Sequence, residues 1–228
     1  MLHYYEGTVF NTNATTIVNT VNCTGVMNAG IALEFSLRYP EMFLDYEEKC
    51  KKKQLEVGKV DYYKDKNISI INFPTKWHFK YPSQLHWIEW GLQDFVKTYK
   101  QNNITSVAFP KLGTNNGKLS WTDVKVLMEK YLANLDIDVY ICLDTDPSPE
   151  GIEKEMLEYF NNLSTTQLSQ IVRITNKQVE TLTKLKPFKR FWHIQNIEGV
   201  GISLYKNLFK HCYSVVTSDV KMEQVSFF

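Results

Sequence analysis

Residues 19–32 read Asn19-Thr20-Val21-Asn22-Cys23-Thr24-Gly25-Val26-Met27-Asn28-Ala29-Gly30-Ile31-Ala32. The β-branched residues predict a strand that runs into a loop of Asn, Thr and Gly, after which Gly-Ile-Ala opens a helix. Such a junction offers backbone N–H groups and a helix N-terminus to a phosphate, and its asparagine side chains can hold sugar hydroxyls. The segment therefore predicts a phosphorylated, sugar-containing ligand.

Strands and helices alternate along the first 162 residues. Short apolar runs predict strands at residues 2–9, 15–21, 60–63, 68–73, 106–109 and 137–143. Helical spacing predicts helices at residues 30–50 with a break at Pro40, at 83–100 with Ser83 as N-cap, at 120–132, and up to about 162. Because most of the strands are continuous apolar runs, we expect a three-layer α/β/α domain with a mostly parallel central sheet.

The distribution of charge divides the chain further. The whole chain carries a net charge of +1, which gives no overall nucleic-acid signature. Residues 1–163 hold 17 basic against 21 acidic side chains, whereas residues 164–228 hold 9 against 4. We therefore predict one domain at residues 1–162 and a small, basic, helical module at residues 163–228, with residues 161–166 as the linker.

Cysteine usage and hydropathy place the chain among cytoplasmic proteins. Cys23, Cys50, Cys142 and Cys212 lie too far apart in the chain for a CxxC metal site or a dense disulfide framework. The N-terminus lacks the regions of a signal peptide, and no apolar run approaches the length of a membrane span. We expect a cytoplasmic protein with free thiols, no metal and no cofactor.

Three loops follow predicted strands, at the sheet edge where parallel α/β proteins bind ligands. The first is the loop after Val21. The second reads Pro74-Thr75-Lys76-Trp77-His78-Phe79, and the third reads Pro110-Lys111-Leu112-Gly113-Thr114-Asn115-Asn116-Gly117-Lys118-Leu119-Ser120-Trp121. Glycine and asparagine at strand ends let the backbone turn with positive φ and approach a ligand closely.

Together these loops resemble the macrodomain family, whose members bind ADP-ribose. The resemblance covers about residues 1–160 and rests on the motifs at residues 19–32, 39–41, 72–78 and 112–121. Within the family, this combination is similar to macrodomains that act as antitoxins by removing ADP-ribose from thymidine in single-stranded DNA. The resemblance implies that activity, with ADP-ribosylated DNA as substrate and a DNA-modifying toxin as partner.

The resemblance also implies roles for individual residues. Asn22 would hold the distal ribose beside the scissile bond, and Lys76 matches the lysine proposed to act on that bond. The set implied to contact ADP-ribose is Thr8, Val9, Asn19, Gly25, Val26, Met27, Gly30, Ile31, Ala32, Thr75, Leu112, Gly113, Thr114, Asn115, Asn116, Gly117, Lys118 and Leu119. Residues 7–10 lack the carboxylate that reads adenine in many members of the family, so adenine selectivity must come from elsewhere.

The chemistry of Lys76 supports the same role. Cleavage of an N-glycosidic bond leaves positive character on C1″, and a lysine amine can attack that carbon or its ring-opened aldehyde only when the amine is neutral. Burial or a neighbouring cation such as Lys111 or Lys118 would lower its pKa. The alternative is a solvated or phosphate-binding lysine. The chain would then bind ADP-ribose without turnover; hydrolysis of O-acetyl-ADP-ribose or ADP-ribosyl-protein is a third possibility.

Aromatic side chains near Lys76 are candidates for stacking on DNA bases. We take Trp77, His78 and Lys111 as DNA-binding candidates, and Phe79 as a second ring that faces a base. Other interpretations are a structural or proton-transferring role for His78. Trp87, Trp90 and Trp121 lie in or beside predicted helices, so we expect them in the core.

The C-terminal module carries two further motifs. Ile197-Glu198-Gly199-Val200-Gly201 fits the turn of a helix-hairpin-helix, with helices at 186–195 and 202–211, and the backbone at Gly199 and Gly201 would contact a DNA phosphate. The alternative is a module for packing or partner binding. Gln224–Phe228 resembles the peptide that docks into the bacterial sliding clamp, unless the two terminal rings fold back onto the body.

Overall fold

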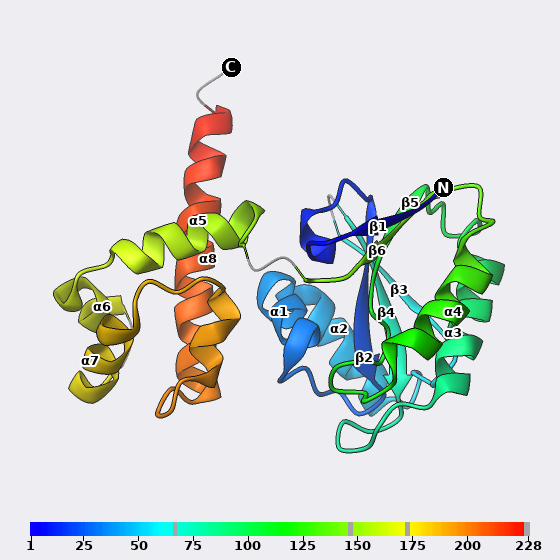
Figure 1. Ribbon diagram of the computed structural model, residues 1–228, viewed down its shortest axis with the longest axis horizontal. Coiled ribbons are helices and arrows are strands. Elements are labelled where there is room, and N and C mark those ends of the chain that lie inside the picture. The colour runs from blue at the N-terminus through cyan, green and yellow to red at the C-terminus, as the bar shows by residue number, and fades with distance from the viewer. Residues whose placement is uncertain (66–67, 146–147, 172–173, 226–228) are drawn as a thin grey trace. The chain divides into compact units, whose positions relative to one another are not determined.

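The computed structural model describes residues 1–65, 68–145, 148–171 and 174–225, with side chains described up to residue 218. The chain forms two compact units, Met1–Thr145 and Asp146–Phe228 (Figure 1). The residues of the expected clamp-binding peptide, Gln224–Phe228, therefore lie outside the residues whose side chains are described. Among the described residues, no helix combines the length and the apolar character that a membrane span requires.

The first unit is built on one six-stranded sheet with the order β1-β6-β5-β2-β4-β3. Its strands are β1 (Leu2–Tyr5), β2 (Thr16–Asn22), β3 (Asp61–Lys64), β4 (Ser69–Lys76), β5 (Ser106–Pro110) and β6 (Asp138–Cys142). Every neighbouring pair is parallel except β3 and β4, which are antiparallel. This confirms the expected mostly parallel sheet, in which β2, β4 and β5 end at the same edge.

Helices cover both faces of this sheet (Figure 1). Helices α1 (Gly30–Arg38) and α2 (Pro40–Lys51) lie on one face, and α3 (Leu85–Thr98) and α4 (Trp121–Leu132) lie on the other. Ile70 belongs to the apolar core beneath α1 and α2, whereas the next residue, Ile71, belongs to the core beneath α3 and α4. Side chains alternate between the faces of a strand, so a strand buried on both faces must be continuously apolar.

Two local predictions in this unit are wrong. The first strand ends at Tyr5 rather than residue 9, because Asp144 turns with a φ of 48° and the bonding to β6 loses its register. Residues Val9–Asn11 form a short 3-10 helix, η1. Ser83 does not cap a helix: α3 begins at Leu85 after Gln84, and the backbone N–H of Ser83 instead donates to the Gly117 carbonyl at 2.9 Å.

The second unit consists of helices. They are α5 (Gly151–Asn162), α6 (Thr165–Ile171), α7 (Asn176–Leu185), the 3-10 helix η2 (Phe191–Asn196) and α8 (Ile202–Val225). Helix α5 packs against α8, so the contacts place it with the second unit, although the sequence suggested a boundary after residue 162. Residues 161–166, expected as a linker, are largely the end of α5 and the start of α6.

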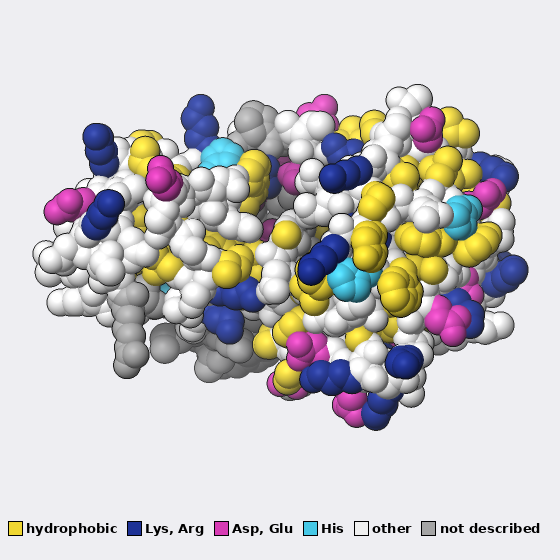
Figure 2. All heavy atoms as spheres, turned by 90° about the horizontal axis from the view of Figure 1, so that it is seen from below, with side chains coloured by type: hydrophobic (Ala, Val, Ile, Leu, Met, Phe, Trp, Pro, Cys, Tyr) yellow, Lys and Arg dark blue, Asp and Glu magenta, His cyan; other side chains and the backbone are white. Residues whose placement is uncertain are grey.

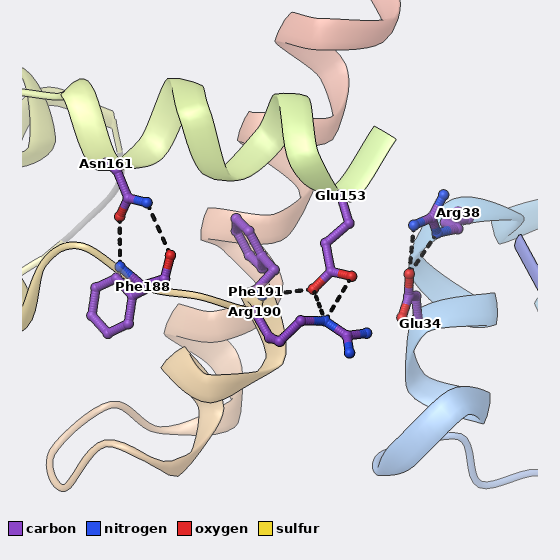
Figure 3. Close-up of polar contacts among 7 residues, drawn as sticks. All are labelled: Glu34, Arg38, Glu153, Asn161, Phe188, Arg190 and Phe191. Atoms are coloured by element: carbon purple, nitrogen blue, oxygen red, sulfur yellow. Dashed lines mark hydrogen bonds and ion pairs between the residues drawn. The ribbon is translucent and has the colours of Figure 1, made fainter. Parts of the chain in front are cut away.

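The helix expected at residues 186–195 is not formed (Figure 3). The side chain of Asn161 donates to the backbone carbonyl of Phe188 at 3.0 Å and accepts from its N–H at 2.9 Å. Glu153 accepts hydrogen bonds from the Arg190 side chain and from the Phe191 N–H. These partners from α5 satisfy the backbone locally in place of helical bonds. The first helix of the predicted helix-hairpin-helix is therefore replaced by an irregular segment and η2.

Candidate active site

The three loops predicted from the sequence converge at the edge where β2, β4 and β5 end. Asn22 and Lys76 are partners in the β2–β4 register, and the Cys23 N–H donates to the Trp77 carbonyl at 3.2 Å. The ammonium nitrogen of Lys76 donates to the Asn116 carbonyl at 2.7 Å. These bonds link residues that lie 40 or more positions apart in the sequence into one site.

Asn22 organises the first loop with its side-chain amide. Its Nδ2 donates to the Val26 carbonyl at 2.6 Å, and its Oδ1 accepts from the Thr24 N–H at 2.9 Å. The Tyr46 hydroxyl donates to the Asn22 carbonyl at 2.8 Å from helix α2. Both ends of the amide thus bond within the loop, so Asn22 shapes the site, and its contact with a ribose stays a prediction.

Helix α1 presents its N-terminus at the end of this loop. Its N-cap residue, Ala29, has no side chain that can cap the helix, and Gly30 takes a φ of 57°. The first-turn N–H groups, which include those of Ile31 and Ala32, have no intrahelical acceptor, and the helix dipole adds partial positive charge. An uncapped helix N-terminus suits a phosphate group, and binding of the diphosphate here stays a prediction.

The amine of Lys76 lies between the second and third loops. The residue is only 8% exposed at the end of β4. Burial lowers the pKa of Lys76 from its ordinary value, and the positive charge of Lys118 lowers it further. Lys76 is therefore neutral in a larger fraction of molecules than a surface lysine, as a nucleophilic amine requires.

The third loop is closely packed where Gly113 and Gly117 meet. Gly113 turns with a φ of 66°, and its carbonyl accepts the Leu119 N–H at 3.1 Å. A Cβ atom on Gly117 would lie 2.1 Å from the Gly113 oxygen and 2.4 Å from the Ser83 hydroxyl. Only glycine fits at this position, because backbone atoms occupy the space of a side chain.

We expect Gly117→Ala to distort the third loop. The collision with the Gly113 carbonyl must move the backbone, which should cost about 1–3 kcal/mol of unfolding free energy and weaken ADP-ribose binding by about tenfold or more. Calorimetric titration with ADP-ribose and denaturant unfolding measure the two effects. The matched control is Gly201→Ala, since a Cβ on Gly201 meets no atom within 4 Å. Unchanged affinity in Gly117→Ala would contradict this packing argument.

Some residues of the predicted ligand set lie beneath the site rather than on its surface. Asn19 is fully buried and donates to Asn72 Oδ1 at 3.1 Å, and Leu112 belongs to the core under α3 and α4. Others of the set are also buried: Val9, Met27, Thr75, Gly113 and Gly117. These residues support the loops from within. The exposed or half-buried members are Thr8, Gly25, Val26, Gly30, Ile31, Ala32, Thr114, Asn115, Asn116, Lys118 and Leu119.

The DNA-binding candidates are partly accessible. Trp77 is exposed, while His78 and Lys111 are half-buried. Gly199 and Gly201 are exposed in the second unit, in the turn before α8, where the Gly199 carbonyl accepts a hydrogen bond from the Gln178 side chain at 2.8 Å. Contact of any of them with DNA stays a prediction.

The other tryptophans divide between core and surface. Trp121 packs against the core, as expected, whereas Trp90 is 49% exposed on α3, so the expectation of a core position is wrong for Trp90. One side of the Trp90 side chain packs over Gly58, and the rest of the tryptophan ring is exposed to solvent.

Sequence reasoning missed two supporting residues. Tyr46 reaches from α2 to the Asn22 carbonyl, and Ser83 lies buried against Gly117 with a hydroxyl that has no partner. Neither carries a sequence signal, because Tyr46 reads as one more apolar residue on a helix face and Ser83 reads as a helix cap.

Cys23 lies beside the site without the properties of a nucleophile. All four cysteines of the chain are free, and Cys23 is half-buried. Burial, with a smaller contribution from Cys50, raises the pKa of the Cys23 thiol to about 12. The thiolate is therefore scarce at neutral pH, which leaves Lys76 as the nucleophile candidate of this site.

A six-stranded α/β fold with glycine-containing loops at one sheet edge defines a known class. The family model described as Macro domain matches residues 18–128. The solved macrodomain of Mycobacterium tuberculosis DarG is 42% identical, with a TM-score of 0.61, over 62% of this chain and 97% of that one. The chain belongs to the macro domain family.

Two further relatives are named for the reaction or the ligand. A DNA ADP-ribosyl glycohydrolase of Mycobacterium tuberculosis is 41% identical over 160 residues, which cover 67% of this chain and 46% of that protein. A solved structure of Thermosipho africanus DarTG in complex with ADP-ribose is 36% identical with a TM-score of 0.61, over 62% of this chain and 41% of that one. The chain spans less than half the length of the curated relatives it matches.

Proposed function

We propose that this protein removes ADP-ribose from thymidine in single-stranded DNA. The observation that carries the proposal is the buried amine of Lys76, which lies 2.7 Å from the Asn116 carbonyl between two ligand loops and has a lowered pKa. The similarity to DNA ADP-ribosyl glycohydrolases supports the substrate class. A macrodomain that only binds ADP-ribose has no need of a lysine with a lowered pKa at this position.

The proposed reaction is hydrolysis of the N-glycosidic bond. The bond between the base nitrogen and C1″ breaks, a water oxygen becomes bonded to C1″, and the water supplies the proton that the base nitrogen takes up. Lys76 would attack C1″ as the base nitrogen leaves, and water would then add to C1″ and release the amine. The N-terminus of α1 and the third loop would hold the diphosphate so that C1″ faces the amine.

A toxin that attaches ADP-ribose to DNA is the partner that this activity would oppose. One relative, from Thermosipho africanus, is named as a fusion of a DNA ADP-ribosyl transferase with a DNA ADP-ribosyl glycohydrolase and is 36% identical over 161 residues. The fusion supports a DarT-like toxin as the partner. This chain would then act as the antitoxin.

The proposal is tested by release of ADP-ribose from defined substrates. The purified chain is incubated with a single-stranded oligonucleotide that carries ADP-ribose on thymidine, and in parallel with guanine-linked DNA, ADP-ribosyl-protein and O-acetyl-ADP-ribose. We expect release from the thymidine-linked oligonucleotide at the highest rate. Tight binding of ADP-ribose without release from any substrate would identify a binding module instead, and faster release from protein or O-acetyl-ADP-ribose would identify a different hydrolase.

The pH dependence of turnover should follow the protonation of Lys76. Because the neutral amine reacts, the rate should rise with pH and level off once Lys76 is largely deprotonated. Lys118→Gln removes the charge that lowers the pKa of Lys76, so the pKa should rise and the ascending part of the profile should move to higher pH. An ascending limb that stays in place or moves to lower pH would rule out this electrostatic coupling.

A further inference from the structure

A cluster of exposed aromatic rings begins directly after Lys76. Trp77 is 60% exposed, Phe79 43% and Tyr81 59%. We call residues 77–81 the aromatic loop. Three large rings in contact with water within five residues are unfavourable for an isolated domain, and such patches mark binding surfaces. Figure 2 shows hydrophobic side chains gathered with histidines and lysines over one face of the first unit.

The aromatic loop is held in a defined shape. The His78 ring lies at its centre, with ring centroids 4.6 Å from Phe79, 5.3 Å from Tyr81 and 6.1 Å from Trp77. The Lys80 N–H donates to His78 Nδ1 at 3.1 Å, and the Tyr81 N–H donates to the His78 carbonyl, also at 3.1 Å. The Trp77 carbonyl accepts a hydrogen bond from the Cys23 N–H. This bond fixes the aromatic loop to the first loop, which follows Val21.

We propose that the aromatic loop stacks the unpaired bases that flank the modified nucleotide. This inference rests on the proposed function, since it concerns the DNA attached to the ADP-ribose. The DNA strand on either side of a nucleotide bound at the Lys76 amine must pass over the neighbouring protein surface. The aromatic rings begin at the next residue, Trp77. Every base has a face that stacks on an aromatic ring, so the platform would bind strands without regard to sequence. Lys80 adds positive charge near Phe79, with its amine 5.7 Å from the ring centroid.

This occupant predicts a preference for single-stranded over double-stranded DNA. In a duplex the bases are already stacked and paired, so their faces are closed to protein rings. The platform therefore binds single-stranded DNA and not a duplex of the same sequence. A protein partner on this surface would show no such dependence on strandedness.

The test measures binding of fluorescently labelled oligonucleotides in a Lys76→Ala background, which prevents turnover. Trp77→Ala and Phe79→Ala are compared with Tyr4→Ala, a control of 44% exposure on β1, at the opposite edge of the sheet from β3. We expect each loop variant to weaken binding of the ADP-ribosylated oligonucleotide by about tenfold, with free ADP-ribose bound as before. The control should change neither affinity.

Several outcomes separate this inference from the proposed function. Equal oligonucleotide affinity in loop and control variants, or equal affinity for duplex and single strand, would overturn the platform. Parallel loss of ADP-ribose binding would show that the loop only maintains the pocket, which overturns it as well. If the wild-type chain released no ADP-ribose from DNA, the proposed function would fail, yet weaker binding of an unmodified single strand by the loop variants would still support the platform.

Discussion

Lys76→Ala should abolish release of ADP-ribose from DNA while ADP-ribose itself remains bound. The substitution removes the amine that donates from the second loop to the Asn116 carbonyl of the third, and loss of a reacting group typically costs about 10³-fold or more in rate. Binding should persist because the N-terminus of α1 would still hold the diphosphate. The third loop loses its bond from Lys76 to Asn116 but keeps the Gly113–Leu119 and Gly117–Ser83 backbone bonds.

The measurement combines single-turnover release from a thymidine-modified oligonucleotide with calorimetric titration of ADP-ribose. Lys76→Arg is an informative second variant, because arginine keeps the charge but is never neutral and so cannot act as a nucleophile. It should be as inactive as the alanine variant. Lys64→Ala removes an exposed lysine at the end of β3 and should keep full activity. Full activity of Lys76→Ala would eliminate the proposed mechanism.

Glu153→Ala should strongly destabilise the second unit. The carboxylate of Glu153 on α5 is buried and accepts from Arg190 Nε at 3.0 Å and from the Phe191 N–H at 2.8 Å (Figure 3). Without this carboxylate, the buried guanidinium of Arg190 and the buried N–H of Phe191 both lose the acceptor that Glu153 provides. Loss of one member of a buried ion pair typically costs about 3–5 kcal/mol of unfolding free energy.

The matched control lies on the same helix. Glu158→Ala removes an exposed carboxylate 4.0 Å from Lys154, and such surface pairs contribute about 0–1 kcal/mol. Urea unfolding followed by circular dichroism compares the two variants, and hydrogen exchange of the α5 and α8 amides locates the loss. A Glu153 variant as stable as the Glu158 variant would show that the ion pair adds nothing to the stability of the unit.

Much of the first unit was predictable from local sequence pattern. Ile70 and Ile71 face opposite cores, and residues 68–73 are mostly apolar. This mostly apolar run is what indicated a parallel sheet between two helical layers. The break at Pro40 between α1 and α2 was also correct, because proline is compatible with the first turn of a helix and not with its interior.

The second unit was less predictable because its backbone depends on distant side chains. Residues 186–195 have helical spacing, but Asn161 and Glu153 bond to the backbone of Phe188 and Phe191 and stabilise a different local structure. Ser83 shows a related effect in the first unit, where its N–H bonds to Gly117 and its hydroxyl is buried against the third loop, so α3 begins after Gln84. Local propensities are worth little against such tertiary bonds.

The sequence alone determined the chemistry of the site: glycines that permit tight turns, an uncapped helix start at Gly30 and a lysine at the end of a buried strand. Only the tertiary structure decided how these groups are used. It engaged both ends of the Asn22 amide within the first loop and brought Lys76 against Asn116, where burial and Lys118 lower the pKa of the amine. The physical reason is that turn formation depends on a few neighbouring residues, whereas burial and electrostatic potential at one nitrogen depend on every segment that packs around it.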